Sequence, residues 1–92
     1  MRVRFFATIR NLTGCVETDF PYQETAGALA RSLCEHYGEA LQKKIFPSGS
    51  IDAFGPEIIF LINGRHVNHL GGTAAPLIPG DRVDVFPVVA GG

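Results

Sequence analysis

The chain has 92 residues, 8 Lys and Arg against 9 Asp and Glu, and a hydrophobic fraction of 46%, which fits one small packed domain. Because the charge is nearly balanced and no basic run occurs, we expect no nucleic-acid partner. No apolar run approaches the ~20 residues that span a bilayer. Met1 leads directly into a strand pattern instead of a signal peptide, so we expect a cytoplasmic protein without a membrane partner.

The first strands are predicted from alternating apolar residues. Residues 2–7 alternate with period two, which places Val3, Phe5 and Ala7 on the buried face. Residues 11–15 have the composition of a turn. Residues 16–20 then predict a second, antiparallel strand, with Val16 and Phe20 sharing one face.

A helix follows this hairpin. Thr25 is a plausible N-cap, apolar residues recur at helical spacing from 29 to 37, and Gly38 suits the position just past the C-terminus. Residues 39–46 predict a second, shorter helix. Residues 47–56 are rich in Pro, Gly and Ser, and we interpret them as a loop that is the most mobile segment inside the domain.

The second half predicts three strands. Residues 57–62 are an apolar run of strand length, and Asn63-Gly64 after it is a strong hairpin signal, with residues 65–68 as the return strand. The last strand covers residues 82–86. The segment 71–79 holds two glycines and two prolines, so a full helix is not expected there.

This order predicts an α+β domain with a β-grasp, ubiquitin-like fold: a mixed sheet with one main helix packed on one face. Its first and last strands are expected side by side and parallel at the centre of the sheet. A ferredoxin-like fold would need a second full helix near residues 71–79 and is therefore disfavoured. We expect the domain to cover residues 1–87 and a flexible tail to cover residues 88–92.

The outer face of the predicted sheet is unusually apolar. Phe6 and Phe86 fall on outward positions of the two central strands, and the run 58–62 is apolar on both faces. An uncovered sheet face normally carries polar residues, so this pattern predicts an interaction surface. The alternative is that the loop 47–56 or a second copy of the chain covers these side chains.

The C-terminal residues form the second functional signal. Pro87 lacks an N–H and ends the strand, and Gly91 and Gly92 have no side chain to pack. From Val88 onward the tail can extend roughly 16 Å at about 3.3 Å per residue, enough to enter another protein's active site. The alternative interpretation is a frayed terminus.

Other constellations give little support for catalysis. Cys15 and Cys34 match no metal or redox spacing; Cys34 is predicted to be buried in the helix and Cys15 to be exposed in a turn. His66 and His69 lie three residues apart, but a zinc site needs about four ligands. Since no nucleophile-with-base motif and no phosphate-binding loop is found, we expect no metal and no independent enzyme.

Two stretches resemble a known family. Residues 5–14, Phe-Phe-Ala-Thr-Ile-Arg-Asn-Leu-Thr-Gly, resemble the opening of MoaD, the small subunit of molybdopterin synthase. Residues 79–83 together with 86–92, which end in Val-Val-Ala-Gly-Gly, resemble the ending of the MoaD/ThiS sulfur-carrier family, and Ile62-Asn63 also matches. The similarity covers both ends and the middle of the chain.

The resemblance implies a carrier role in which Gly92 reacts. An E1-like enzyme would use ATP and magnesium to adenylate its carboxylate, and a persulfide donor would convert the adenylate to a thiocarboxylate. Molybdopterin biosynthesis is the favoured destination of the sulfur, with the chain as the small subunit of a molybdopterin synthase. The carrier itself would bind no cofactor. The residues expected to contact partners are Phe6, Arg10, His66, Phe86, Pro87, Val88, Val89, Ala90 and Gly91.

Alternatives remain open for the pathway and the role. His66 stands at a usually apolar family position, and Val88 to Ala90 after a single proline resemble carriers of the cysteine-biosynthesis type. A ubiquitin-like modifier would join Gly92 to a lysine of a target protein, whereas self-linkage would have only Lys43 and Lys44 as acceptors. A plain interaction module would use the apolar face and leave the tail idle.

Overall fold

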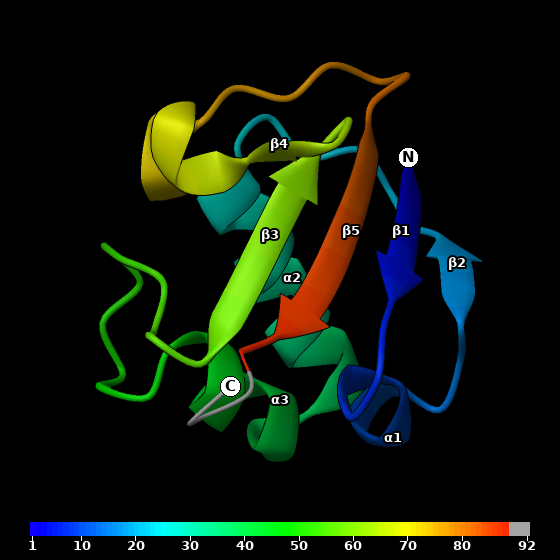
Figure 1. Ribbon diagram of the computed structural model, residues 1–92, viewed down its shortest axis with the longest axis vertical. Coiled ribbons are helices and arrows are strands. Elements are labelled where there is room, and N and C mark those ends of the chain that lie inside the picture. The colour runs from blue at the N-terminus through cyan, green and yellow to red at the C-terminus, as the bar shows by residue number, and fades with distance from the viewer. Residues whose placement is uncertain (89–92) are drawn as a thin grey trace.

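The structure is a computed structural model and describes residues 1–88. One mixed sheet in the order β2-β1-β5-β3-β4 has α2 behind it, with α1 and α3 near the end where β1 and β5 stop (Figure 1). The elements are β1 (Arg2–Phe5), α1 (Ile9–Thr13), β2 (Glu17–Asp19), α2 (Ala26–Tyr37), α3 (Glu39–Ile45), β3 (Ile58–Ile62), β4 (Arg65–His66), the 3₁₀ turns η1 (Val67–His69) and η2 (Gly72–Ala74), and β5 (Arg82–Pro87).

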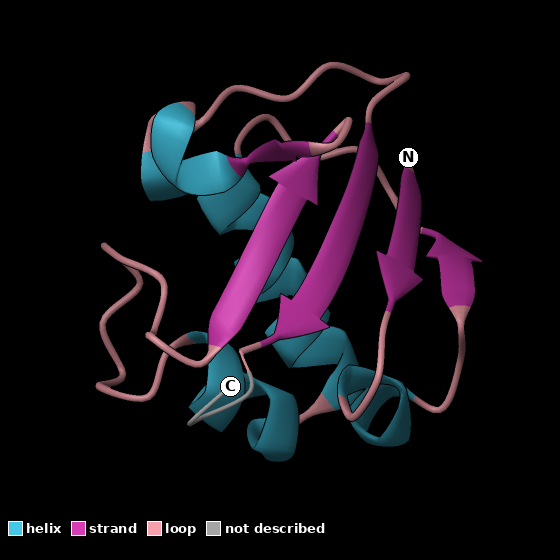
Figure 2. Cartoon of the chain, in the orientation of Figure 1, coloured by secondary structure: helices cyan, strands magenta, loops and turns pink. Residues whose placement is uncertain are grey.

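The central pair of strands confirms the predicted β-grasp arrangement. β1 runs parallel to β5, with Val3 opposite Val83, although 80 residues separate them. β2 pairs with β1, and β3 with β5 and β4, all antiparallel (Figure 2). The α+β class is confirmed: residues 1–88 contain three α-helices, of which α2 is the longest.

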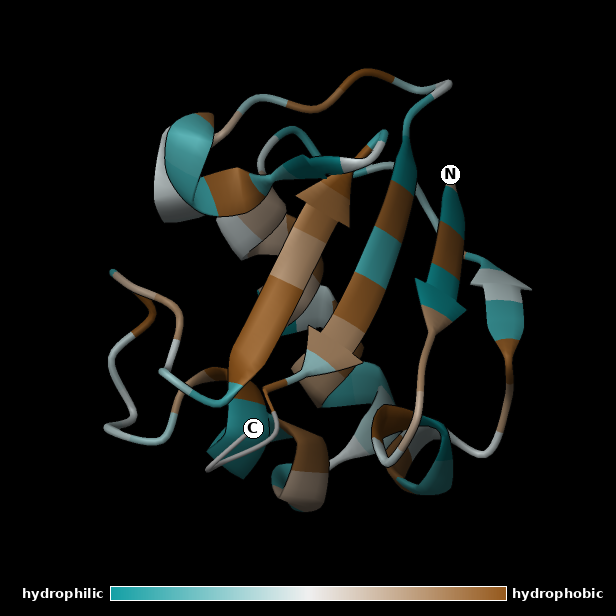
Figure 3. Cartoon of the chain, in the orientation of Figure 1, coloured by the Kyte–Doolittle hydropathy of each residue, from teal (hydrophilic) through white to brown (hydrophobic). Residues whose placement is uncertain are grey.

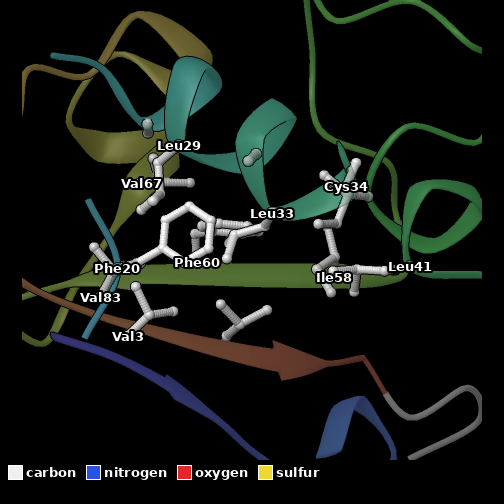
Figure 4. Packing of buried hydrophobic residues seen from close by; sticks show 14 of the residues in the cluster. Val3, Phe20, Leu29, Leu33, Cys34, Leu41, Ile58, Phe60, Val67 and Val83 are labelled. Atoms are coloured by element: carbon white, nitrogen blue, oxygen red, sulfur yellow. The ribbon is translucent and has the colours of Figure 1, made fainter. Parts of the chain in front are cut away.

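The core lies between the inner face of the sheet and α2 (Figure 4). α2 contributes one apolar face, including the fully buried Leu29 and Leu33. Phe60 from β3 and Val3 from β1 meet this face from the sheet. Burying a side chain of this size contributes about 1.5–3 kcal/mol relative to exposure, so the sheet–helix contact is the main source of stability.

Both predicted ends of α2 are confirmed. The Thr25 hydroxyl accepts a hydrogen bond from the Ala28 N–H at 3.1 Å, which satisfies one of the free donors of the first turn. Gly38 has φ of 102°, a conformation that favours glycine, and its N–H donates to the Cys34 carbonyl at 2.8 Å. The chain then turns directly into α3, which confirms the shorter second helix.

The first strand was predicted two residues too long. β1 ends at Phe5, and Ala7 is exposed with φ of 52° instead of lying on the buried face. The turn predicted over residues 11–15 is also wrong, because α1 occupies most of it and Gly14, at φ of 75°, ends the helix by donating to the Arg10 carbonyl. Five residues are too few for helical periodicity to be recognised in the sequence. The complete burial of Ile9 holds this short helix in place.

The second strand is shorter than predicted as well. It covers Glu17–Asp19, and Val16 is 60% exposed, whereas Phe20 is buried as expected. The ladder to β1 begins at Glu17 opposite Arg4. Val16 therefore precedes the paired residues, where period-two alternation no longer fixes the direction of a side chain.

The Asn63-Gly64 hairpin is confirmed, with φ of 51° and 83° at its two turn residues, as a type I′ turn requires. The predicted return strand over residues 65–68 is wrong beyond His66, because the chain enters η1. The His66 Nδ1 atom accepts from the Asn68 N–H at 3.1 Å and caps this turn. Between residues 71 and 79 the only helical element is η2.

The segment from residue 47 to residue 56 is a loop, as predicted. Its second half is fixed by aromatic packing: Phe54 stacks on Phe60 at 4.7 Å between ring centroids and on Phe46 at 5.8 Å. The Gly55 N–H donates to the Ile45 carbonyl at 2.7 Å. The loop is therefore anchored to α3 and β3 and does not cross the outer face of the sheet (Figure 1).

Candidate docking face and tail root

An apolar patch lies on the outer face of the sheet near the end of β5. Phe6 and Phe86 stack with ring centroids 4.1 Å apart and an interplanar angle of 9°. Ile59 stands directly opposite Phe86, and Leu61 follows two residues later on the same face of β3. All four side chains are half-buried. We call Phe6, Ile59, Leu61 and Phe86 the apolar patch; it confirms the predicted orientation of Phe6 and Phe86.

The hydropathy of the central strands shows why this patch forms. β1 and β5 carry alternating bands, whereas β3 is apolar along its length (Figure 3). In a two-layer domain the inward residues of β3 are needed for the core, and its outward Ile59 and Leu61 are left facing solvent. The patch is therefore encoded mainly by the unbroken apolar run of β3 and by the two phenylalanines.

Two guanidinium groups lie beside the Phe6 ring. The Arg4 and Arg10 Cζ atoms are 5.4 Å and 5.8 Å from the ring centroid, within the range of cation–π attraction. The Arg10 Nε–H also donates to the Phe5 carbonyl at 3.0 Å. This bond holds Arg10, one of the predicted partner-binding residues, at the margin of the apolar patch.

Toward the other end of the same face, β1 and β5 are joined by an ionic pair. The Arg4 Nε and Nη2 atoms donate to the two Asp84 carboxylate oxygens at 2.8 Å and 2.9 Å. Arg82 adds a third contact, with Nε 3.6 Å from Asp84 Oδ2. The hydrogen bond to Asp84 raises the pKa of Arg4, so this guanidinium stays charged.

Burial of Asp84 was not foreseen from the sequence, because an outward position beside Val83 and Val85 predicts a solvated carboxylate. Only 4% of Asp84 is exposed. The signal that would have found it is the register: in a parallel pairing of the first and last strands, Arg4 stands opposite Asp84. Opposite charges at directly paired positions then predict an ion pair.

His66 borders the apolar patch at the far edge of the sheet, opposite Leu61. It is half-buried, and its ring centroid lies 5.9 Å from that of His69. Within residues 1–88, no group of three or more His, Cys, Asp or Glu side chains is placed to hold a metal ion. No helix of those residues is long and apolar enough to cross a membrane.

The tail begins beside the apolar patch. Pro87 pairs with Ile58 at the end of the β5–β3 ladder, and the next residue, Val88, donates its N–H to the Glu57 carbonyl at 2.9 Å. Val88 is 42% exposed. Pro87 and Val88, which we call the tail root, thus leave the sheet at the end that carries Phe86. The predicted site residues Val89, Ala90, Gly91 and Gly92 lie outside the described residues.

The two thiols differ in environment. Cys34 is buried in α2 as predicted, and burial raises the pKa of its thiol to about 11. Cys15 was predicted to be exposed, but it is half-buried and packs against the core. Its sulfur lies 3.5 Å from the Tyr37 hydroxyl oxygen. The buried position of Cys34 therefore disfavours a reactive thiolate.

Comparison with known proteins places this geometry in a family. The family model described as "ThiS family" matches residues 3–92. The chain belongs to the ThiS family. The small archaeal modifier protein 3 of Haloferax volcanii is 38% identical over 94 residues, covering 100% of this chain and 98% of that protein. The resemblance inferred from the two ends of the sequence is thereby confirmed at the level of the family.

Solved structures agree with the assignment to the ThiS family. The small archaeal modifier protein 1 of Methanosarcina acetivorans has a TM-score of 0.84 at 30% identity, covering 99% of this chain and 94% of that chain. CysO of Mycobacterium tuberculosis, at 22% identity and a TM-score of 0.80 over 96% and 98% of the two chains, shares the fold. The chain is thus a member of a family of sulfur carriers and ubiquitin-like modifiers.

Proposed function

We propose that this protein is a sulfur carrier whose C-terminal glycine, Gly92, cycles between carboxylate and thiocarboxylate. The single observation that supports this most strongly is the position of the apolar patch at the tail root, on a chain that ends in Gly91-Gly92. A partner that covers Phe6 and Phe86 would receive the tail in the same encounter. An E1-like adenylating enzyme is the partner class that this geometry suits.

The chemistry requires activation because a carboxylate is a poor electrophile. In the proposed cycle, a Gly92 carboxylate oxygen attacks the α-phosphate of ATP, and pyrophosphate leaves; magnesium acts in the activating enzyme. The terminal sulfur of a persulfide donor then attacks the acyl carbon and displaces AMP. A second thiol cleaves the resulting S–S bond, becomes oxidised to a disulfide with the donor sulfur, and leaves the thiocarboxylate on Gly92.

In this cycle the chain binds and positions but does not catalyse. The apolar patch would supply desolvation energy for docking. The hydrogen bond from Val88 to Glu57 would fix the direction in which the tail leaves β5. Arg10, held over Phe6, would meet a carboxylate of the partner. The reacting groups other than Gly92 would come from the activating enzyme and from the sulfur-accepting enzyme.

We propose molybdopterin biosynthesis as the destination of the sulfur, with this chain as the small subunit of a molybdopterin synthase. The support is the Phe-Phe-Ala-Thr-Ile-Arg-Asn-Leu-Thr-Gly opening at residues 5–14. Delivery to cysteine or to another sulfur metabolite is the alternative, and the Val-Ala-Gly-Gly ending favours it.

A second candidate function is protein modification, in which Gly92 forms an isopeptide bond with a lysine. The observation that favours it is the 38% identity over the full chain to a protein named small archaeal modifier protein 3. Both functions begin with the same acyl adenylate, so one activation step would serve either outcome.

The test is the intact mass of the protein recovered from its native host, followed by reaction with the cognate E1-like enzyme, ATP and sulfide. We expect a mass gain equal to the exchange of one oxygen for sulfur, localised to Gly92. Deleting Gly92 should abolish the gain without unfolding the domain, as judged by circular dichroism. A truncated protein that still accepts sulfur would contradict the proposal.

A further inference from the structure

The chain offers few nucleophiles that could intercept its own activated terminus. It contains two lysines, Lys43 and Lys44, which are adjacent on α3. The other amine is that of Met1, which donates a hydrogen bond to the Phe20 carbonyl at 2.6 Å in a partly buried position. This bond ties the N-terminal amine to the residue just past the end of β2, whereas the two lysine amines lie on the surface of α3.

The thiols are poorer nucleophiles in this fold. Cys34 is only 8% exposed, and its raised pKa of about 11 keeps the sulfur protonated near neutral pH. Cys15 is half-buried, with its sulfur 3.5 Å from the Tyr37 hydroxyl oxygen. The amines of α3 are therefore the groups best placed to react with an acyl adenylate carried by a second copy of the chain.

The two lysines are not equivalent, because consecutive residues of a helix point about 100° apart. Lys44 packs toward the sheet: its side chain is 41% exposed, and its Nζ atom lies 3.6 Å from Glu57, the residue that binds the tail root. Lys43 points away from the domain, with 75% of its side chain exposed. An incoming C-terminus reaches Lys43 without displacing a contact to β3 or to the tail root.

Lys43 also has a carboxylate beside it. Glu39 lies one helical turn earlier, with Oε1 3.5 Å from the Lys43 Nζ atom. A carboxylate at this distance is within reach to take a proton from the ammonium, which frees the nitrogen lone pair for attack. Lys43 thus combines an accessible amine with a neighbouring proton acceptor.

We propose that Lys43 of one copy is the acceptor for Gly92 of a second copy, which gives an isopeptide-linked dimer. The inference rests on the proposed activation of Gly92. The Lys43 nitrogen forms a bond to the acyl carbon of the Gly92 adenylate, the bond from that carbon to the phosphate oxygen breaks, and AMP leaves. The ammonium protons pass to Glu39 and to water, and no oxidant or reductant is needed.

The experiment uses the full chain, the cognate E1-like enzyme, ATP and magnesium, without a sulfur donor. ATP–pyrophosphate exchange measures adenylation, and tryptic peptide mapping locates the linkage. Because Arg82 is the last basic residue, the branch on the acceptor lysine is residues 83–92. We expect a covalent dimer whose mass is twice the monomer less one water, with the branch on Lys43.

Matched variants separate the two lysines. Lys43→Arg should abolish the branched peptide, whereas Lys44→Arg should leave its yield unchanged. Glu39→Gln should slow dimer formation by about 100-fold, the low end of what a positioned general base supplies. Glu35→Gln is the control, since it removes a carboxylate from the equivalent i,i+4 pair with Arg31 on α2 and should have no effect.

The outcomes distinguish the two proposals. Exchange without a dimer, or a dimer whose branch lies on Lys44 or persists in Lys43→Arg, overturns the linkage and leaves the proposed activation intact. No exchange with an enzyme that is active on its own carrier overturns the proposed activation and the linkage together.

Discussion

Two side-chain pairs on the outer face connect β1, or the residue just after it, with β5, and they differ in chemistry. Arg4 and Asp84 face each other and form a bidentate ion pair. Two residues further along the chain in each case, Phe6 just past β1 and Phe86 in β5 stack with ring centroids 4.1 Å apart. The ionic pair satisfies its hydrogen-bonding groups inside the chain. The aromatic pair keeps half-buried rings at the surface, beside the tail root.

The two pairs show that one sheet face can hold a contact satisfied within the chain next to a surface that a partner could bury further. A buried carboxylate must be paired, and Asp84 is paired with Arg4. A half-exposed aromatic stack gains further burial only from a partner. Arg4 connects the two regions because its guanidinium also lies over the Phe6 ring. The ionic pair thereby holds a cation beside the Phe6 ring of the apolar patch.

We expect the largest effect from a substitution that removes the aromatic pair. Phe86→Ala should weaken binding to the E1-like enzyme by about 30-fold, the roughly 2 kcal/mol of an interface hot spot. The domain should remain folded, since the lost stacking is worth about 0.5–1.5 kcal/mol beyond area burial. Calorimetric titration against the enzyme gives the affinity, and thermal unfolding gives the stability.

The control for this prediction is Phe86→Leu, which keeps an apolar side chain opposite Ile59 and should retain most of the affinity. Equal loss of affinity in the two variants would mean that the ring itself is recognised. Full affinity in Phe86→Ala would place the docking surface elsewhere.

A smaller effect should follow from breaking the ionic pair. Asp84→Asn keeps the shape of the side chain but leaves Arg4 and Arg82 without the carboxylate that they share. We expect a lower midpoint of thermal unfolding, because a guanidinium loses its charged acceptor. Affinity for the partner should change less than in Phe86→Ala. A variant that binds as poorly as Phe86→Ala would show that the ionic pair is itself part of the docking surface.

The smallest expected effect is a pH dependence of the folding stability to which neither the Arg4–Asp84 pair nor the Phe6–Phe86 pair contributes. Burial raises the pKa of Cys34 from 9.0 to about 11 and that of Tyr37 from 10.0 to about 12. The folded state therefore holds protons that the unfolded chain releases. Stability should be complete below about pH 9 and should fall as the pH rises through these ranges.

Urea unfolding at a series of pH values tests this assignment. Cys34→Ala should flatten the first part of the decline, whereas Asp84→Asn should lose stability with the same slope as the unsubstituted protein. The raised pKa of Arg4 keeps that guanidinium charged throughout the range. A flatter decline in Asp84→Asn would assign the titration to the outer face.

The sequence by itself determined the elements with long or strongly marked patterns. α2 was predicted with both caps because Thr25 and Gly38 carry local hydrogen-bonding and backbone signals. The hairpin at Asn63 and the outward placement of Phe6 and Phe86 also followed from local chemistry and period-two alternation. The reacting tail remains a prediction, because residues 89–92 lie outside those described.

Tertiary structure alone decided the features that depend on distant neighbours. α1 has five residues, too few to nucleate without the burial of Ile9 in the core. Asp84 is buried because Arg4, 80 residues away, stands opposite it. Val16 is exposed because the ladder to β1 starts one residue later. In each case the sequence supplies the side chain, but packing against distant residues, and for Asp84 and Val16 the strand register, decides whether it meets a partner or water.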